Sequence, residues 1–275
     1  MQVGNNSQVS SNVYANANQS LNKIATGVTL NQASDDASSL AISSNLQAQA
    51  SGYTQAIENN NSAIALTQIA DGAISEQSKI LDNVKEKLLQ ASTDTTSQEG
   101  RDALLNDIKG LLEQFDNIAS STNYNDTNLL QNSSSDNSAT NSLQFQAGEE
   151  SSDLIETSSV QSNTQGLGLS ALVNQDASTF SSSNAREFLD DIDSAISGLS
   201  DIRSQFAAVQ NQLESSTTNL LSQKTETLGA NAVYDTDFAK ESANFSKQNI
   251  LAQIGAFTST QANNINQQTV GRLLT

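Results

Sequence analysis

Apolar residues recur at alternating spacings of four and three along one long stretch near the C-terminus. The stripe consists of Phe188, Ile192, Ala195, Leu199, Ile202, Phe206, Val209, Leu213, Ser216 and Leu220, of which Ser216 alone is polar. A heptad pattern sustained over more than four repeats predicts an α-helix whose narrow apolar side packs against other helices. At 1.5 Å per residue the stripe would be roughly 50 Å long. An ordinary bundle helix would show the same pattern, so the stripe predicts helix packing without specifying the partners.

The 275-residue chain contains no Pro, no Cys and no His. The absence of Pro fits long uninterrupted helices, because Pro removes a backbone donor. Without Cys and His, a thiolate nucleophile and the commonest general base and transition-metal ligand are missing. Hydrolysis by carboxylates alone stays open, but Trp is absent and aromatic residues make up 4% of the chain, so sugar-binding platforms are scarce. We therefore expect no enzyme, no catalytic residue and no cofactor.

The charge balance is strongly acidic, with 12 Lys and Arg against 30 Asp and Glu and a formal net charge of -18. A polyanion repels phosphate backbones, so we expect no nucleic-acid partner. No basic cluster would attract an anionic membrane surface, and no apolar run approaches the length of a bilayer span, so we expect no membrane insertion. The N-terminal stretch has neither the positive start nor the apolar core of a standard secretion signal.

Two predicted helices and a small β region precede the stripe. Residues 40–90 and 98–120 read as helices, whereas residues 110–185 contain no Lys or Arg and are rich in turn-forming Asn, Ser and Asp. Within that region we predict a β-hairpin from residues 142–146 and 154–160 and a helical turn at 169–173. On the first of these helices we assign the following residues to the buried side: Ile57, Ile64, Ile69, Ile74, Leu81, Val84 and Leu88.

Both ends of the chain share one arrangement, in which a short apolar-striped helix joins a long helix through a polar, acidic hinge. Asp35 and Asp36 suit the N-terminus of a new helix, where unpaired amides favour side-chain oxygens and negative charge. Asp235 and Asp237 are their counterparts, between a polar linker from residue 221 and a last helix over 238–265. Isolated helices of this kind are marginal in water, so we expect the ends to be disordered in a free subunit and to fold on assembly. Pairing of the two ends within one chain is the alternative.

Three segments carry a resemblance to bacterial flagellins. "SLNKIATGVTLNQASDDASSLAIS", residues 20–43, resembles the N-terminal signature of that family, and "EQFDNIASSTNYNDTNLL", residues 113–130, is similar to a second family motif. "YDTDFAKE", "QNILAQ" and the closing "VGRLLT" resemble the C-terminal signature. The resemblance covers about residues 10–130 and 186–275 and is that of a short flagellin with core domains only, similar to those of epsilonproteobacteria.

The resemblance implies a mainly α fold: a long antiparallel coiled-coil or bundle rod with a small β-hairpin region and two terminal helices that form an inner-core pair. The domains implied are an N-terminal inner-core helix (1–33), two parts of the rod (34–122 and 184–222), an outer hairpin region (123–183), and a linker with the C-terminal inner-core helix (223–275). We expect contacts with neighbouring subunits from Leu21, Ile24, Val28, Asp35, Asp36, Leu40, Ile42, Leu46, Phe238, Phe245, Ile250, Leu251, Ile254, Leu273 and Leu274.

The chain departs from the family pattern at several positions. Ser39 replaces a family glycine, Asn125-Asp126 replaces Asn-Gly in a turn, and a C-terminal proline is missing. In many flagellins the segment matching residues 81–92 contacts a protofilament and binds the animal innate flagellin receptor. The key Arg and Leu of that segment correspond to Asn83 and Lys87 here, and the nearby acid corresponds to Asp107. We therefore hypothesise that this chain evades that receptor and forms the protofilament contact elsewhere.

The function that the resemblance implies is that of a structural subunit, exported by a dedicated type III route, that polymerises into the extracellular flagellar filament. Implied partners are copies of the chain itself, an export chaperone, the filament cap and the hook-junction proteins. A hook–filament junction protein is the nearest alternative, and an acidic, carboxylate-based surface hydrolase is a remote one. We predict no metal site, with calcium in the acidic hairpin as an outside alternative.

Overall fold

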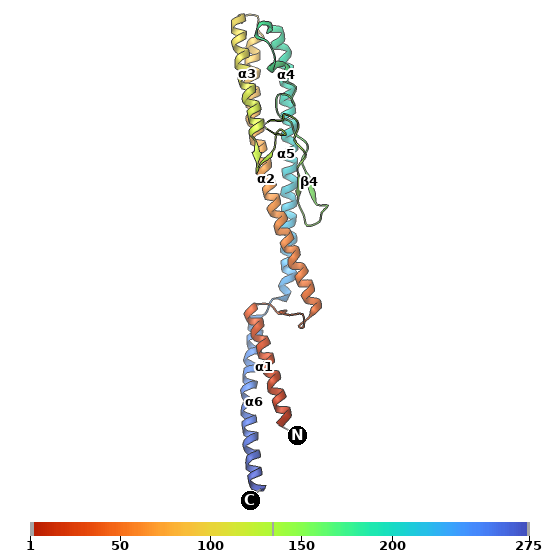
Figure 1. Ribbon diagram of the computed structural model, residues 1–275, viewed down its shortest axis with the longest axis vertical. Coiled ribbons are helices and arrows are strands. Elements are labelled where there is room, and N and C mark those ends of the chain that lie inside the picture. The colour runs from red at the N-terminus through yellow and green to blue at the C-terminus, as the bar shows by residue number, and fades with distance from the viewer. Residues whose placement is uncertain (1–2, 134, 274–275) are drawn as a thin grey trace. The chain divides into compact units, whose positions relative to one another are not determined.

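The computed structural model describes residues 3–133 and 135–273, apart from the side chains of residues 3–10, 233, 262–263, 265–266 and 269–273. Long helices dominate it (Figure 1). The helices are α1 (Val3–Thr26), α2 (Ala37–Ala91), α3 (Gln98–Ser121), α4 (Ser170–Val173), α5 (Ser182–Asn231) and α6 (Phe238–Leu273), with short 3₁₀ turns η1 (Ala177–Thr179) and η2 (Ala232–Tyr234). The strands are β1 (Asn123–Tyr124), β2 (Thr127–Asn128), β3 (Gln144–Gln146) and β4 (Leu154–Glu156).

The chain forms two compact units. The bundle unit comprises Ser51–Lys224, and the terminal unit comprises Met1–Ala50 together with Thr225–Thr275. Among the residues that the model describes, no helix is both long and apolar enough to cross a bilayer.

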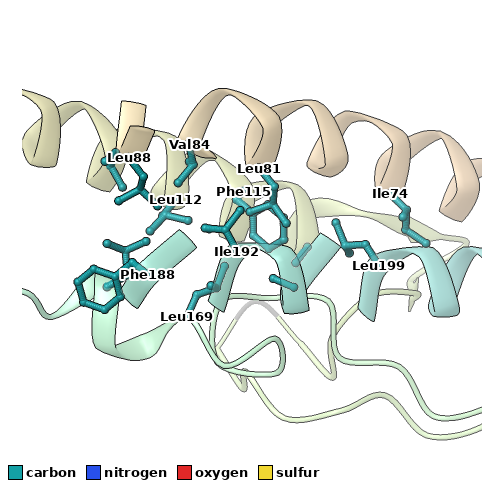
Figure 2. Packing of buried hydrophobic residues seen from close by; sticks show 14 of the residues in the cluster. Ile74, Leu81, Val84, Leu88, Leu112, Phe115, Leu169, Phe188, Ile192 and Leu199 are labelled. Atoms are coloured by element: carbon teal, nitrogen blue, oxygen red, sulfur yellow. The ribbon is translucent and has the colours of Figure 1, made fainter. Parts of the chain in front are cut away.

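The apolar stripe of α5 faces the core of the bundle unit, as its heptad spacing predicts. Phe188, Ile192 and Leu199 are buried, and they point toward side chains of α2 and α3 (Figure 2). Ion pairs give the direction of the helices: Lys85 of α2 pairs with Asp193 of α5, and Asp71, earlier on α2, accepts a 2.6 Å hydrogen bond from Nε of Arg203, later on α5. The two helices therefore run antiparallel, and the prediction of an antiparallel, mainly α bundle is confirmed.

Ser216, the polar member of the stripe, has hydrogen-bond partners. Its hydroxyl accepts from Nδ2 of the buried Asn60 at 3.2 Å and donates to the carbonyl oxygen of Ala147 at 2.8 Å. A serine at this point of the seam thus provides an acceptor for the buried amide nitrogen of Asn60 and joins the outer hairpin region to α5.

The buried side of α2 differs from the predicted one. Ile74, Leu81, Val84 and Leu88 are buried as expected, but Ile69 is 42% exposed. Apart from Leu66, the other buried positions of α2 are small or polar, and hydrophobicity alone does not reveal them. The buried residues that the sequence interpretation missed are Ala50, Ala56, Asn60, Ala63, Leu66, Thr67, Ala70, Gln77 and Ala91.

The boundaries of the helices agree with the prediction where a capping residue is present and differ from it elsewhere. Ser97 caps α3 by accepting a 3.1 Å hydrogen bond from the amide of Gly100, in line with the predicted start at residue 98. The predicted polar linker from residue 221 is wrong, because α5 continues to Asn231 and only a short connection remains before Phe238. Nothing in residues 221–231 breaks a helix, since their polar side chains are tolerated on an exposed surface and no Pro is present. The last helix also runs beyond the predicted Ile265, to Leu273.

The β region consists of two short hairpins. β3 pairs antiparallel with β4, with Phe145 opposite Ile155, which confirms the predicted hairpin, although its strands are shorter than predicted. β1 pairs with β2 through a two-residue turn in which Asn125 and Asp126 have φ values of 48° and 62°. Positive φ at both central residues is the turn geometry that favours Asn-Gly, so Asp126 occupies a position better suited to glycine.

Candidate subunit interface

The terminal helices α1 and α6 lie side by side (Figure 1). Among their described side chains, the ones that become buried are small: Ala17 and Ser20 of α1 and Ala252 of α6, each 7% exposed. Small side chains let two helices approach closely, but each removes little apolar area from water. The pair is therefore held by few strong apolar contacts of its own.

Large apolar side chains of the same two helices remain in solvent. Phe257 is 73% exposed, which is unusual for a side chain of this size. The other exposed members are Tyr14, Leu21, Phe238, Ile250, Leu251 and Ile254, each at least 41% exposed. A group of exposed apolar side chains of this kind is typical of a surface that another molecule covers.

Most of the predicted contact residues belong to this surface or border it. Leu21, Phe238, Ile250, Leu251 and Ile254 are exposed, and so is Ile42 near the start of α2. Ile24, Val28, Leu40, Leu46 and Phe245 are half-buried. The side chain of Leu273 and the whole of Leu274 lie outside the described residues.

Two of the most exposed residues, Tyr14 and Phe257, were absent from the predicted set. Tyr14 lies on the apolar stripe of the first helix and Phe257 on that of the last, so the signal that indicated their neighbours was available for them as well.

A short backbone pairing joins the two hinge segments next to α1 and α6. Gly27, with φ of +76°, ends α1 in a conformation that glycine adopts without strain. Val28 and Asp235 form an antiparallel bridge, in which the amide of Thr29 donates to the carbonyl of Tyr234 at 2.8 Å and the amide of Thr236 donates to the carbonyl of Gly27 at 2.9 Å. The ends of the chain, far apart in sequence, are thereby fixed to each other at the base of the helix pair.

Asp35 closes the loop that follows α1. Its carboxylate accepts hydrogen bonds from the backbone amides of Asn31 at 3.1 Å and Gln32 at 3.2 Å, and from Nε2 of Gln19 on α1 at 3.0 Å. The hydrogen bond from the Asn31 amide is the main reason why the pKa of Asp35 lies below its ordinary value. The predicted role of this acid in a helix start is thus only indirect, since it shapes the loop before the helix.

Asp36 caps α2, as predicted. Its carboxylate accepts from the backbone amides of Ser38 at 3.0 Å and Ser39 at 3.1 Å, and from the hydroxyl of Ser39 at 2.6 Å. The Ser39 hydroxyl lowers the pKa of Asp36 most, followed by the Ser39 amide. Ser39 therefore contributes a hydrogen bond from its side chain to this cap.

Asp237 has the matching role at the start of α6. Its side chain accepts from the amide of Lys240 at 3.0 Å, and its carbonyl accepts from the amide of Glu241 at 2.9 Å. Both hinges thus end in an aspartate that starts the next helix, which confirms the similarity between the two ends of the chain.

Charge is distributed unevenly along the sequence. All 30 carboxylate residues lie between Asp35 and Glu241, so residues 1–34 and 242–275 contain none. The bases in those two segments are Lys23, Lys247 and Arg272. Copies of the chain can therefore bring their terminal segments together without the carboxylate repulsion that the rest of this polyanion would cause.

Comparison with known proteins identifies the family. Residues 1–135 match the bacterial flagellin N-terminal helical region, and residues 189–274 match the bacterial flagellin C-terminal helical region. The flagellin of Halalkalibacterium halodurans is 33% identical over 257 residues, which cover 92% of this chain and 91% of that protein. The chain belongs to the bacterial flagellin family. It is accordingly a structural subunit of the flagellar filament, an extracellular polymer.

Solved structures show the same fold for this flagellin. The crystal structure of Bacillus cereus flagellin superposes with a TM-score of 0.51 at 23% identity and covers 63% of this chain and 94% of that one. A Vibrio parahaemolyticus protein, provisionally described as a flagellar hook-associated protein, has a TM-score of 0.57 at 10% identity and covers 73% of this chain and 99% of that one. The fold is thus shared with a hook-associated protein, and it is sequence identity along nearly the whole chain that separates a filament flagellin from the junction-protein alternative.

The positions predicted to differ from the receptor-binding pattern of flagellins lie on the bundle unit. Asn83 is exposed on α2, and Nζ of Lys87 lies 2.7 Å from Oδ2 of Asp107 on α3. The ammonium group of Lys87 is thus engaged in an ion pair within the chain.

The acidic hairpin region contains no cluster of metal-binding side chains among the residues that the model describes. No group of three or more carboxylates there, or elsewhere in residues 3–133 and 135–273, is placed to hold a metal ion.

Proposed function

We propose that this flagellin polymerises through the apolar surface of its terminal helices, and that these helices become fully ordered only when neighbouring copies cover them. The observation that carries the proposal is the contrast within one helix pair: alanine and serine are buried between α1 and α6, whereas Phe257, Ile250 and Ile254 are more than half exposed.

The energetic argument follows from burial. Ordering the backbone costs on the order of 1–2 kcal/mol per residue, whereas burying a large apolar side chain contributes roughly 1.5–3 kcal/mol. A pair that buries mainly methyl groups does not offset that cost over 24 residues of α1 and 36 of α6. Contact with other copies would bury the large side chains as well, so assembly and ordering are coupled.

Assembly after salt addition tests the proposal. Ammonium sulfate is expected to induce filaments from purified monomer, because it screens repulsion between acidic subunits and favours apolar burial. A double substitution, Ile250→Ser with Ile254→Ser, should reduce the pelleted fraction at least tenfold. Ile69→Ser, at an exposed isoleucine of the bundle unit, is the matched control and should assemble like the wild type. Assembly of the double variant at the control level would contradict the proposal.

The remaining partners follow from the family. Export by a dedicated type III route, and contacts with an export chaperone, the filament cap and the hook-junction proteins, are expected of a flagellin and are proposed for this chain. The absence of enzymatic activity is proposed on the same basis. Immunodetection of the chain in the culture medium of a strain with intact hooks but no cap protein checks the export route, and retention in the cytoplasm would contradict it.

Evasion of the animal innate flagellin receptor is proposed as a second property. The supporting observation is the Lys87–Asp107 ion pair, which puts two charges on a surface where related chains offer an apolar side chain. A cell reporter for that receptor should give at least tenfold weaker activation by the purified monomer than by a flagellin with the Arg and Leu pattern. A full response would refute the evasion, and Asn83→Arg with Lys87→Leu should raise the signal if these two positions cause it.

A further inference from the structure

Two segments that are distant in the sequence meet within the terminal unit: residues 27–29 after α1 and residues 234–236 before α6. We call this pairing the hinge clasp. It consists of an antiparallel bridge with two backbone hydrogen bonds, and a side chain adds a third. The hydroxyl of Thr29 donates to the carbonyl oxygen of Tyr234 at 2.7 Å, and the amide of Thr29 donates to the same oxygen at 2.8 Å. Thr29 therefore supplies two donors to one acceptor.

The position of Tyr234 explains why its carbonyl needs these donors. Tyr234 is the last residue of the 3₁₀ turn η2, and the carbonyls at the end of a helical turn have no partner within that turn. A carbonyl oxygen has two lone pairs and can accept two hydrogen bonds. The amide and the hydroxyl of Thr29 thus provide the partners that the end of η2 lacks.

The two backbone hydrogen bonds alone would make a weak pairing. Even a complete two-stranded hairpin is marginally stable in water, and this bridge is shorter than a hairpin. The hydroxyl of Thr29 therefore contributes a large share of the hydrogen bonding in the hinge clasp. A further contact joins the helices that lead into it, because the hydroxyl of Ser43 on α2 donates to Oδ1 of Asn231, the last residue of α5, at 2.6 Å.

We propose that Thr29 is a positioning residue for assembly: it keeps the hinge clasp closed in the free subunit, so that α1 and α6 start side by side before a neighbouring copy covers them. With the clasp closed, the two helices do not have to find each other during assembly, and the entropic cost of bringing them together is not charged to that step. Beyond the clasp the helices become fully ordered only on assembly. The inference therefore rests on the proposed function and adds the contact from which ordering starts.

A second threonine of the hinge clasp provides a matched control. Thr236 is buried, and its amide donates to the carbonyl of Gly27 at 2.9 Å. Within the part of the chain that the model describes, the hydroxyl of Thr236 has no hydrogen-bond partner. Valine has nearly the shape of threonine but no hydroxyl, so Thr29→Val removes one hydrogen bond from the clasp and Thr236→Val removes none.

Hydrogen exchange of the full-length monomer, kept dilute at pH 7, tests whether the clasp is closed before assembly. In the wild type, the amides of Thr29 and Thr236 should exchange at least tenfold more slowly than those of residues 5–14 in α1. Thr29→Val should accelerate exchange of the two bridge amides about fivefold, the effect expected for the loss of one neutral hydrogen bond. Thr29→Ser, which keeps the hydroxyl, and Thr236→Val should both stay close to the wild type.

Two results of this experiment would overturn the inference. One is exchange of the bridge amides as fast as that of residues 5–14 in the wild-type monomer. The other is an equal effect of Thr29→Val and Thr236→Val, which would show that the Thr29 hydroxyl does not hold the clasp closed.

Covalent closure of the clasp tests its role in assembly. The hydrogen bonds of the bridge come from the residues on either side of Val28 and Asp235, and in such a pair the Cα atoms lie about 4.5 Å apart, within the range of a disulfide. The chain contains no Cys, so Val28→Cys with Asp235→Cys introduces a single possible disulfide within the subunit. When these substitutions are combined with Thr29→Val, the reduced chain should need about fivefold more protein than the wild type to form filaments in ammonium sulfate. The oxidised chain should assemble like the wild type, and no recovery on oxidation would overturn the inference.

Failure of this inference and failure of the proposed function give different results. A wild-type chain that forms no filaments would refute assembly through the terminal helices, whereas the exchange of the bridge amides is measured in the monomer and does not depend on filaments. Normal wild-type filaments together with unprotected bridge amides in the monomer would refute only the role of Thr29.

Discussion

The bundle unit and the terminal unit are both helical, but they bury different kinds of side chain. In the bundle unit Phe115, Phe180, Leu81 and Ile192 are almost completely buried. Among the described residues of the terminal unit, the buried ones are Ala17, Ser20, Ala50, Thr236 and Ala252. The bundle unit thus has a core of large apolar side chains, although a few such as Ile69 and Leu89 are exposed, whereas the terminal unit leaves Phe238, Ile250, Ile254 and Phe257 in solvent and buries none of comparable size among its described residues.

This difference shows that helix content is a poor guide to independent stability. Burying a leucine or phenylalanine contributes roughly 1.5–3 kcal/mol, and burying one methyl-sized group contributes about 0.8 kcal/mol. The bundle unit therefore has the contacts needed to fold by itself, and we propose that the terminal unit reaches comparable burial only in an assembly of copies.

Deletion of one terminal helix should have the largest effect. Removal of residues 1–33 or of residues 236–275 is expected to abolish polymerisation completely, because each deletion removes part of the exposed apolar surface. Sedimentation after addition of ammonium sulfate measures the loss.

The bundle unit should survive either deletion. Circular dichroism of the truncated chains should show a cooperative thermal transition, since neither deletion removes any residue of the bundle unit or of its hydrophobic core. Filaments that persist after either deletion, or a truncated chain with no cooperative transition, would contradict the division of roles between the two units.

Matched substitutions of phenylalanine provide a direct comparison of the two units. Phe115→Ala, at a residue with no exposed surface, should lower the free energy of unfolding of the monomer by about 3–5 kcal/mol. Phe257→Ala, at a residue 73% exposed, should lower it by less than about 0.5 kcal/mol but should reduce assembly. Urea unfolding of the monomer and sedimentation of filaments give the two readouts, and equal effects on monomer stability would show that the terminal unit is as well packed as the bundle.

Acid should loosen the helix start at Asp36. The hydrogen bonds from Ser39 and Ser38 lower the pKa of Asp36, so its contribution to stability is present above its unfolded pKa and is lost as the pH falls through the folded pKa. Exchange of the Ser38 and Ser39 amides, corrected for intrinsic rates, should therefore accelerate below about pH 4. Asn is an equally good cap without a charge, so Asp36→Asn should remove this pH dependence, and an unchanged profile in that variant would assign it to another group.

The smallest effect is expected at the β1–β2 turn. Asp126→Gly should raise the free energy of unfolding by about 0.5–1 kcal/mol, because glycine adopts a φ of 62° without the strain of a side chain. Asp126→Ala, which keeps a Cβ at the same position and loses the polar side chain, should be less stable than the wild type. Urea unfolding of both variants measures the pair, and a shift of the same sign in both would show that backbone strain is not the cause.

Sequence reasoning was most successful where periodicity or capping chemistry was strong. The spacing from Phe188 to Leu220 predicted the buried face of α5, and the acids at Asp36 and Asp237 marked helix starts. It failed on α2, because alanine and amide side chains such as Ala63 and Gln77 can face a core only when a partner helix comes close or supplies hydrogen bonds. Gln77 donates from Nε2 to the carbonyl of Ser162 at 2.8 Å, a partner 85 residues away. It also failed at residues 221–231, where a polar composition suggested a linker although nothing terminates the helix before Asn231.

The sequence by itself determined the helical class, the starts of the helices and the family, because these depend on residue types at short spacings and on local capping groups. Only the tertiary structure decided that Ser216 pairs with Asn60 and Ala147, that Ile69 lies in solvent, and that the contact between α1 and α6 buries Ala17 and Ser20 while Phe257 stays exposed. The physical reason is that burial depends on which distant residue lies opposite a side chain, and that information is not contained in the side chain or in its neighbours along the chain.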